Sequence, residues 1–217
     1  QGSANFEHFP PLCLAKMGIS GLLPMLKSIS RSVHLEQFSG KTVAIDAYSW
    51  LHKGAYSCSL DLVLGVTNDS YITYCLNRLN LLLHYNVNPI MVFDGGALPS
   101  KLETEHKRKS SRELYREKVH ACLREGNRKD AYFHSQKCVE ISPSIANRLI
   151  NELKARNIQF IVAPYEADAQ MAYLDKIGMV DAIISEDSDL LLFGCRKVLF
   201  KLDKSGNAEQ VLLEDLA

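Results

Sequence analysis

Six acidic residues stand at or shortly after the ends of four short apolar runs of the chain, where their side chains could act together. They are Asp46, Asp94, Glu166, Asp168, Asp187 and Asp189. Ligands of open α/β sheets bind beyond the carboxyl ends of the strands, so acids at such positions would meet in one crevice. Clustered carboxylates repel each other unless cations neutralise them, and their hard oxygens suit Mg²⁺ or Mn²⁺. Two such ions, about 4 Å apart, can activate a water and stabilise the leaving oxygen of a phosphodiester.

A single acid after a strand has a simpler explanation, because it usually caps the next helix or interacts with its dipole. Glu166 or Asp187 taken alone fits that role. The whole set is harder to explain by capping. No Walker A or G-x-G-x-x-G loop offers a competing nucleotide site, and the turn at Gly95 and Gly96 is too short to cradle phosphates.

The elements that must position these acids alternate between strand-like and helix-like patterns. Strands are predicted at 42–46, 89–94, 158–162, 181–185 and 197–202, with a last extended run that includes 210–213. Helices are predicted at 70–86, 99–125, 130–137, 143–156 and 166–177. This alternation of apolar strands and helices predicts an α/β fold with a mostly parallel central sheet flanked by helices.

The predicted helix at 99–125 is polar and basic. Although the chain has no net charge, residues 101–129 hold ten Lys or Arg against five Asp or Glu. Lys101, Arg108 and Arg112 recur at i, i+7 and i+11, so they share one face that could grip phosphates. With few apolar positions, the helix is expected to stand partly off the body. The alternative is a solvated helix whose charges pair with one another.

Three ring-bearing residues, Tyr48, Trp50 and His52, follow the first predicted strand. An aromatic ring beside such a site can stack on a frayed base, a contact worth ~1–3 kcal/mol. Trp50 fits a core position better. For Tyr48 and His52 a structural role is the alternative.

The composition is that of an ordinary globular domain, with 217 residues and 47% hydrophobic content. No apolar run approaches the roughly 20 residues that span a bilayer, which argues against a membrane protein. The six cysteines, among them Cys13, are scattered and form no C-x-x-C pair, so reduced thiols of an intracellular protein are expected. Residues 1–16 lack periodicity and are expected to be an extension outside the fold.

Four longer motifs carry a resemblance to a known family. They are Met17-Gly-Ile-Ser-Gly-Leu-Leu23, Val92-Phe-Asp-Gly95, Ala163-Pro-Tyr-Glu-Ala-Asp-Ala-Gln170 and Ser185-Glu-Asp-Ser-Asp-Leu-Leu191. From Met17 onward the sequence resembles the structure-specific 5′ nucleases, the flap endonuclease/XPG family. It is most similar to the exonuclease 1 branch, because Asp168 follows Tyr165-Glu166-Ala167 and because of the segment Trp50-Leu-His-Lys-Gly54. Flap endonucleases tend to carry Glu at position 168.

The resemblance implies a PIN-like 5′-nuclease core with a protruding helical arch. It implies a 5′→3′ double-stranded DNA exonuclease, with 5′-flap endonuclease activity, in mismatch repair, end resection and recombination. Two Mg²⁺ ions, which Mn²⁺ can replace, would be held by the six acids. Lys101 and Arg108 would bind the scissile phosphate. The DNA contacts implied or predicted at this stage are Gly18, Tyr48, His52, Lys101, Arg108 and Arg112.

The implied partners are DNA ends, nicks, gaps and 5′ flaps together with mismatch-repair proteins, for a nuclear protein expected to be a monomer. Residues 17–217 would form the catalytic domain, with an N-region at about 17–115 and an internal region at about 150–217. The family's seventh acid and its helix–two-turn–helix element are expected to lie beyond Ala217, so this domain is expected to be truncated.

Two other functions remain open at this point. A flap endonuclease would release longer 5′ fragments, whereas an exonuclease releases mononucleotides. A catalytically silent scaffold would bind DNA ends without regard to Mg²⁺ and would never cut.

Overall fold

The computed structural model describes residues 22–216, which are built around one seven-stranded sheet. The strands are β1 (Arg31–His34), β2 (Thr42–Asp46), β3 (Asn88–Phe93), β4 (Gln159–Val162), β5 (Ala182–Ile184), β6 (Lys197–Phe200) and β7 (Asn207–Leu212). Their order across the sheet is β1-β7-β6-β5-β2-β3-β4. From β6 to β4 every neighbouring pair is parallel, and antiparallel pairing of β7 with β6 and β1 completes the other edge.

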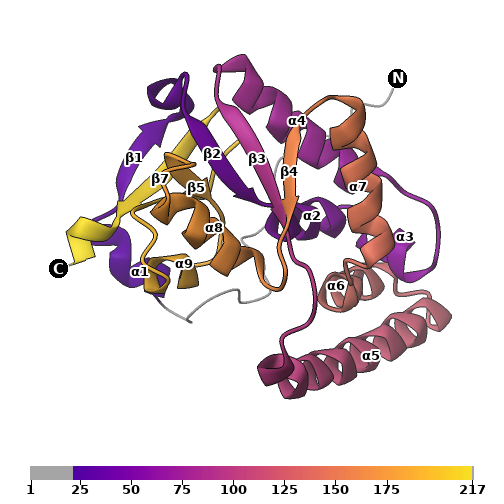
Figure 1. Cartoon of the computed structure of the whole chain (residues 1–217). Helices are drawn as coiled ribbons and strands as arrows, with labels where there is room; N and C mark the ends of the chain where they lie inside the picture. Colours follow the sequence, from indigo (N-terminus) through magenta and orange to yellow (C-terminus); the bar gives the residue numbers. More distant parts are fainter. Residues whose placement is uncertain (1–21, 217) are drawn as a thin grey trace.

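Helices cover both faces of this sheet (Figure 1). The helices are α1 (Leu22–Met25), α2 (Ala47–Tyr56), α3 (Ser59–Val63), α4 (Ser70–His84), α5 (Leu102–Arg124), α6 (Arg128–Cys138), α7 (Pro143–Ala155), α8 (Ala167–Lys176) and α9 (Asp189–Leu192). Short 3-10 turns occupy Leu26–Ser28, Leu35–Phe38, Pro99–Lys101 and Leu213–Leu216.

The two faces of the sheet belong to separate hydrophobic clusters. Val43 and Ile45 of β2 pack with α2, α4 and α7, while Ala44 between them packs with α8 and α9. Successive side chains of a strand point to opposite faces, so a strand buried on both sides reads as a continuous apolar run. The predicted α/β fold with a mostly parallel central sheet is therefore confirmed.

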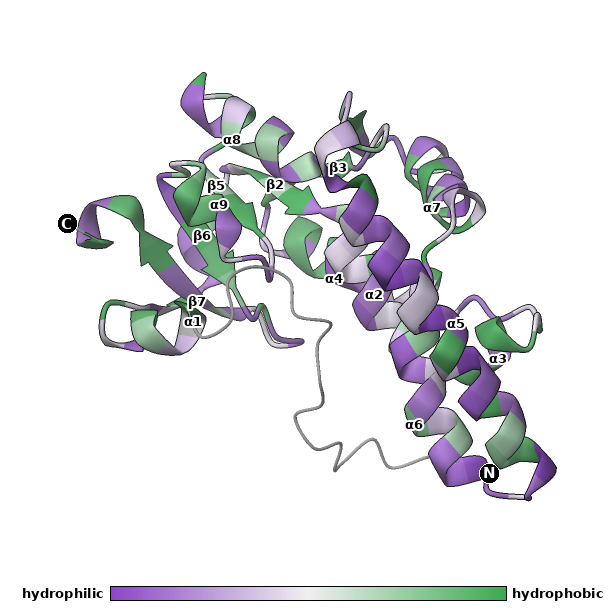
Figure 2. Cartoon of the chain, turned by 90° about the horizontal axis from the view of Figure 1, so that it is seen from below, coloured by the Kyte–Doolittle hydropathy of each residue, from purple (hydrophilic) through white to green (hydrophobic). Residues whose placement is uncertain are grey.

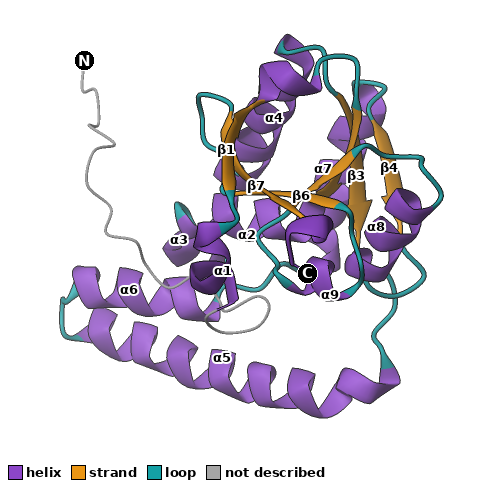
Figure 3. Ribbon diagram, turned by 90° about the vertical axis from the view of Figure 1, so that its left-hand side faces the viewer, coloured by secondary structure: helices purple, strands orange, loops and turns teal. Residues whose placement is uncertain are grey.

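Helix α5 lies apart from the sheet and packs mainly on α6 (Figure 3). Its one buried residue is Val119, which joins a small cluster with Leu60, Ala131 and Cys138. Most of the helix is hydrophilic (Figure 2). The expectation that this basic helix stands partly off the body is confirmed.

Strand β1 and the helices α1, α2, α3 and α9 were not predicted, and β7 was predicted only in part. Strand β1 buries only Val33, so it shows no apolar run. Strand β7 spans Asn207–Leu212, so it contains most of the expected run at 210–213, whose last residue begins a 3-10 turn. Helix α2 contains Gly54 and several aromatic residues, which are weak helix formers. The glycine permits close packing, because a Cβ there would lie 2.8 Å from the Cα of Tyr71 in α4.

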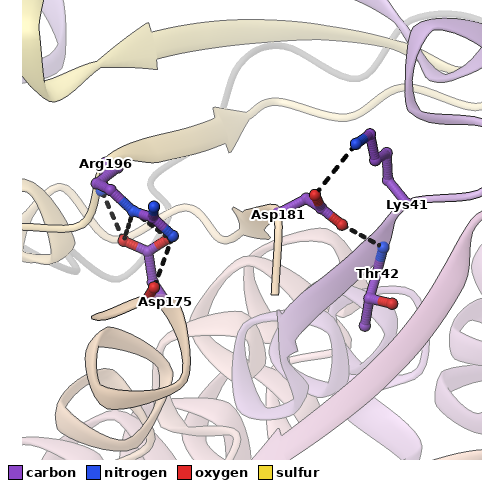
Figure 4. Close-up of polar contacts among 5 residues, drawn as sticks. All are labelled: Lys41, Thr42, Asp175, Asp181 and Arg196. Carbon is purple, nitrogen blue, oxygen red and sulfur yellow. Dashed lines mark hydrogen bonds and ion pairs between the residues drawn. The ribbon is translucent and has the colours of Figure 1, made fainter. Parts of the chain in front are cut away.

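Ion pairs brace the amino-terminal edge of the parallel strands (Figure 4). Asp181, just before β5, accepts a hydrogen bond from the Thr42 N–H at 2.9 Å and pairs with Lys41 at 3.4 Å. Nearby, the carboxylate of Asp175 at the end of α8 accepts bonds from the backbone and guanidinium of Arg196. These contacts hold the strands together at the end opposite the six acids.

The structure also bears on the predictions about membrane spans and cysteines. Within residues 22–216 no helix has the length and apolar character needed to cross a bilayer. The described cysteines, which are Cys58, Cys75, Cys122, Cys138 and Cys195, are free thiols, as predicted. Cys13 lies outside the described residues.

Candidate metal and nucleic-acid site

The strand order brings the six acids to one edge of the sheet. Strands β5, β2, β3 and β4 are neighbours and run parallel, so their carboxyl ends lie side by side. Asp46 ends β2 and Asp94 follows β3. Glu166 and Asp168 lie at the start of α8, after β4. Asp187 and Asp189 lie in the loop after β5 and at the start of α9.

The carboxylates lie close enough to perturb one another. The pKa of Asp168 rises from 3.8 to about 8, first because the group is buried and then because the charges of Asp46, Asp187 and Asp94 repel its ionised form. The pKa of Asp46 rises to about 6, chiefly because of burial, with further contributions from Asp94 and Asp187. Acids from four separate strand ends therefore form one electrostatic group.

The pKa values of Asp94 and Asp187 are raised as well. Burial raises the pKa of Asp94, and the charge of Glu166 adds to that rise. Burial also raises the pKa of Asp187, together with repulsion from Asp189 and Glu166. A set of carboxyls that resists ionisation is a set that cations would stabilise.

Two of the six clustered acids also cap helices at this edge of the sheet. Asp46 Oδ1 accepts the Ser49 N–H at 3.0 Å, and Asp94 Oδ1 accepts the Ala167 N–H at 2.8 Å, so both acids cap helices. Asp187 Oδ1 accepts the Asp189 N–H at 2.9 Å. Glu166 stands at the N-cap position of α8 without a side-chain capping bond, so the capping explanation is wrong for that residue.

A buried serine that we did not single out from the sequence joins two of the acids. Ser185 Oγ donates to Asp46 Oδ2 at 3.1 Å and accepts the N–H of Asp187 at 3.1 Å. Ser185 is 1% exposed, so it fixes the loop after β5 against the end of β2. It belongs to the quoted motif that starts at this residue, but only the fold shows that its hydroxyl reaches Asp46.

The Gly95–Gly96 turn packs against the loop that carries Glu166. The Gly95 N–H donates to the Tyr165 carbonyl at 2.6 Å, and the Gly96 N–H donates to the Pro164 carbonyl at 3.0 Å. A Cβ on Gly95 would lie only 1.9 Å from the carbonyl oxygen of Ala163. The turn therefore needs glycine for a close approach of two backbones, which sets the spacing between Asp94 and Glu166.

Replacing Gly95 by alanine is expected to destabilise the fold by ~1–3 kcal/mol, because a methyl group must displace backbone atoms. The matched control is Gly96→Ala, whose Cβ would lie 3.4 Å from the Pro164 carbonyl oxygen and should cost less than ~1 kcal/mol. Urea unfolding followed by circular dichroism measures both. Equal losses for the two variants would contradict this account of the turn.

One residue of the basic helix region joins the acids. Lys101, which precedes α5, forms an ion pair with Glu166, and that pairing raises the pKa of Lys101. Arg108 instead pairs with Glu105 of its own helix at 2.8 Å. Arg112 pairs with Glu140 at 3.1 Å. For Arg108, the alternative that charges of the helix pair with one another therefore describes this structure.

Tyr48 and His52 lie on the first turns of α2, beside the acids and the arginines respectively. The charge of Asp94, after burial, raises the pKa of Tyr48. The pKa of His52 falls from 6.5 to about 4, because the ring is desolvated and faces Arg112 and Arg108. His52 is therefore neutral near pH 7. Trp50 is buried in the core, as predicted, and Gly18 lies outside the described residues.

The donor set fits a hard divalent cation better than any other cofactor. It consists of carboxylate oxygens, and the charge of Lys101 partly offsets them. Among residues 22–216, however, no three Asp, Glu, His or Cys side chains are gathered tightly enough to form a ready-made metal group.

Comparison with known proteins places the chain in a family. The model of the XPG N-terminal domain matches residues 17–115, and that of the XPG I-region matches residues 157–216. The chain belongs to the XPG family. This outcome confirms the resemblance drawn from the four motifs, and the two matched segments contain all six acids.

Relatives of this XPG-family chain include exonuclease 1 of Arabidopsis thaliana, which is 54% identical over 88% of the chain, and exonuclease 1 of Drosophila melanogaster, 46% identical over 92%. The chain spans 26% and 27% of those relatives. Among solved structures, the catalytic core of Rad2 in complex with DNA substrate matches 92% of the chain and 56% of that core, with a TM-score of 0.67 and 28% identity.

Proposed function

We propose that this chain forms the catalytic part of a 5′→3′ DNA exonuclease that also cuts 5′ flaps, a hydrolase of phosphodiester bonds. The observation that carries the proposal is the electrostatic coupling of acids from four adjacent strand ends, with Asp168 as the most perturbed. Strongly shifted groups at the carboxyl edge of an α/β sheet mark a functional site. The similarity to exonuclease 1 proteins and to the DNA-bound Rad2 core supports DNA as the substrate.

The six acids would hold two Mg²⁺ ions, or Mn²⁺, directly or through water. Bound there, the cations would supply an activated water and stabilise the charge that develops on the phosphate. The chain's own groups prepare the site. Ser185 fixes Asp46 relative to Asp187, and Lys101 lowers the repulsion at Glu166 while placing a cation where a phosphate would approach.

The DNA contacts would come from α2 and the basic helix. A neutral His52 can stack on a base at the DNA end without forming an ion pair with a phosphate. Tyr48 lies beside Asp94, close to the acids. Arg108 and Arg112 can bind phosphates once they leave Glu105 and Glu140. Roles in mismatch repair and end resection, partner proteins of that pathway, a monomeric state and a nuclear location belong to the same proposal.

The direct test is cleavage of a 5′-labelled DNA duplex and of a matched 5′-flap substrate, with Mg²⁺ and with a chelator. The proposal expects mononucleotides from the duplex, metal-dependent cleavage, and longer fragments from the flap. Longer fragments alone would favour a flap endonuclease, for which the supporting feature is the long basic helix α5, which begins directly after Lys101. DNA binding that ignores Mg²⁺, with no cleavage by either metal, would favour the silent scaffold.

Ser185→Ala is expected to lower the cleavage rate about 10-fold or more, because groups that orient metal ligands typically contribute 10–100-fold. It should also cost ~1–3 kcal/mol of stability, since Asp46 and the Asp187 N–H lose a buried partner. The matched control is Ser59→Ala. Ser59 is fully buried and bonds to Ser135 at 2.7 Å, away from the acids, so this variant should lose stability but keep its cleavage rate. Equal rates in the two variants would contradict the role of Ser185.

A further inference from the structure

A second ion pair joins the site to helix α2. Lys53 Nζ lies 2.5 Å from Glu186 Oε1, and the two side chains are only 21% and 11% exposed. Ion pairs exposed to water contribute little, whereas removing one partner of a shielded pair leaves the other charge uncompensated. Because this pair is shielded from water, loss of either partner is expected to disturb the segments that the two residues join.

Glu186 also holds a third segment. The same Oε1 atom accepts the backbone N–H of Lys201 at 3.1 Å. Lys201 has a φ of +54°, a left-handed conformation that a lysine adopts only where its surroundings hold it. Glu186 thus ties together α2, its own loop after β5 and the turn after β6.

The pair connects the two halves of the proposed site. Lys53 follows His52 on α2, and Glu186 lies between Ser185 and Asp187. The turn after β6 has a separate anchor, because Arg78 of α4 donates to the carbonyl oxygens of Leu202 and Asp203. Loss of Lys53 would therefore act mainly on the loop of residues 185–189.

We propose that Lys53 and Glu186 form a positioning pair, which fixes the loop carrying Asp187 and Asp189 against the helix carrying Tyr48 and His52. This inference rests on the proposed function, since it takes the acids as cation ligands and α2 as a DNA contact. Its consequence is a fixed distance between the carboxylates and the place where a DNA end would lie. Neither residue is among the acids proposed to hold the cations or the side chains proposed to contact DNA.

The test compares Lys53→Met with Lys53→Arg and with a control, Lys41→Met. Lys41 also loses an ion pair, to Asp181, but at the opposite edge of the sheet (Figure 4). The first readout is hydrogen exchange at the amides of Asp187 and Asp189, which are hydrogen-bonded within the loop. The second is Mn²⁺ affinity by titration calorimetry, and neither readout depends on cleavage.

Lys53→Met is expected to speed exchange at these two amides about 10-fold or more and to weaken Mn²⁺ binding by about 10–100-fold. Lys53→Arg should retain most of the amide protection and most of the Mn²⁺ affinity, and Lys41→Met should match the wild type in both. If Lys53→Met does not fold, Glu186→Gln replaces it. That variant removes the charge, keeps an acceptor for Lys201, and should show the same two changes at smaller size.

Wild-type exchange in the loop, or wild-type Mn²⁺ affinity, in a folded Lys53 or Glu186 variant would overturn the positioning role. The test of the positioning pair can fail or succeed independently of the test of the nuclease proposal. A wild-type protein that binds Mn²⁺ but cuts no DNA would sink the nuclease proposal, while the exchange and affinity data would still decide the role of the pair.

Discussion

Asp187→Ala is expected to lower the rate of DNA cleavage about 10³-fold or more, which corresponds to roughly 4 kcal/mol of lost transition-state stabilisation. Asp187 is 9% exposed, and its charge interacts with Glu166 and Asp168 after β4 and with Asp46 at the end of β2. Its removal would leave a divalent cation with an incomplete set of ligands. The fold should persist, because the loss of one repelling charge offsets the loss of the bond to the Asp189 N–H.

The matched control is Asp181→Ala, at the opposite end of the same strand. Asp181 stabilises the fold through Thr42 and Lys41, and its pKa is lowered chiefly by the Thr42 N–H. This variant should lose some stability but retain the cleavage rate. Rates are measured on a 5′-labelled duplex in Mg²⁺, with circular dichroism as the check on folding. Full activity of Asp187→Ala would reject the assignment of this acid.

The metal-free protein is expected to become less stable as the pH rises from about 4 to about 8. The pKa values of Asp168 and Asp46 are about 8 and about 6 in the folded chain, against 3.8 for the usual carboxyl. The folded form therefore holds protons that the unfolded form has released, and stability falls as these groups ionise. Asp181 and Asp203, whose pKa values are lowered, act in the other direction, but only as the pH falls below about 4.

Saturating Mg²⁺ should reverse this loss. A ligand at 100 times its dissociation constant adds about 2.7 kcal/mol to the stability of the folded state. In a domain of this size that is a rise in Tm of roughly 5–10 °C, largest at pH 8. Thermal melts at pH 5, 6.5 and 8, with chelator or Mg²⁺, measure the effect. In the Asp168→Asn variant, Tm should change less with pH and should rise less when Mg²⁺ is added. A wild-type Tm that is independent of both pH and Mg²⁺ would contradict the electrostatic account.

Much of the fold was predictable because its central strands are buried on both faces. The runs that became β2 to β6 are apolar and end in turns or acids, and the helices at 70–86 and 143–156 show clear periodicity. Strand β1 gave no such signal, since its pairing with β7 and not its composition makes it a strand. Tertiary context likewise made a helix of residues 47–56, where Asp46 supplies the cap.

The gathering of the six acids at one edge was predictable because they follow four strands, and parallel strands end at the same edge. Ser185 and the pair of Lys53 with Glu186 were not, although all three lie in motifs that the sequence displays. Their partners are distant along the chain, and only the register of β5 against β2 brings them together. The present partners of Arg108 and Arg112 were equally hidden, since a charge pattern does not say which of several acids each arginine meets.

The place of β2 between β3 and β5 has a consequence for how the protein is made. The hydrogen bond between Asp46 and Ser185 joins residues 139 positions apart, and β5 completes the central pairing only after the segment between β2 and β5 has been synthesised. Until then one edge of β2 has no neighbour, and contacts of such long sequence separation form slowly. The acidic site is therefore incomplete until β5 has been synthesised, and the unpaired edge of β2 is a place where another strand could add.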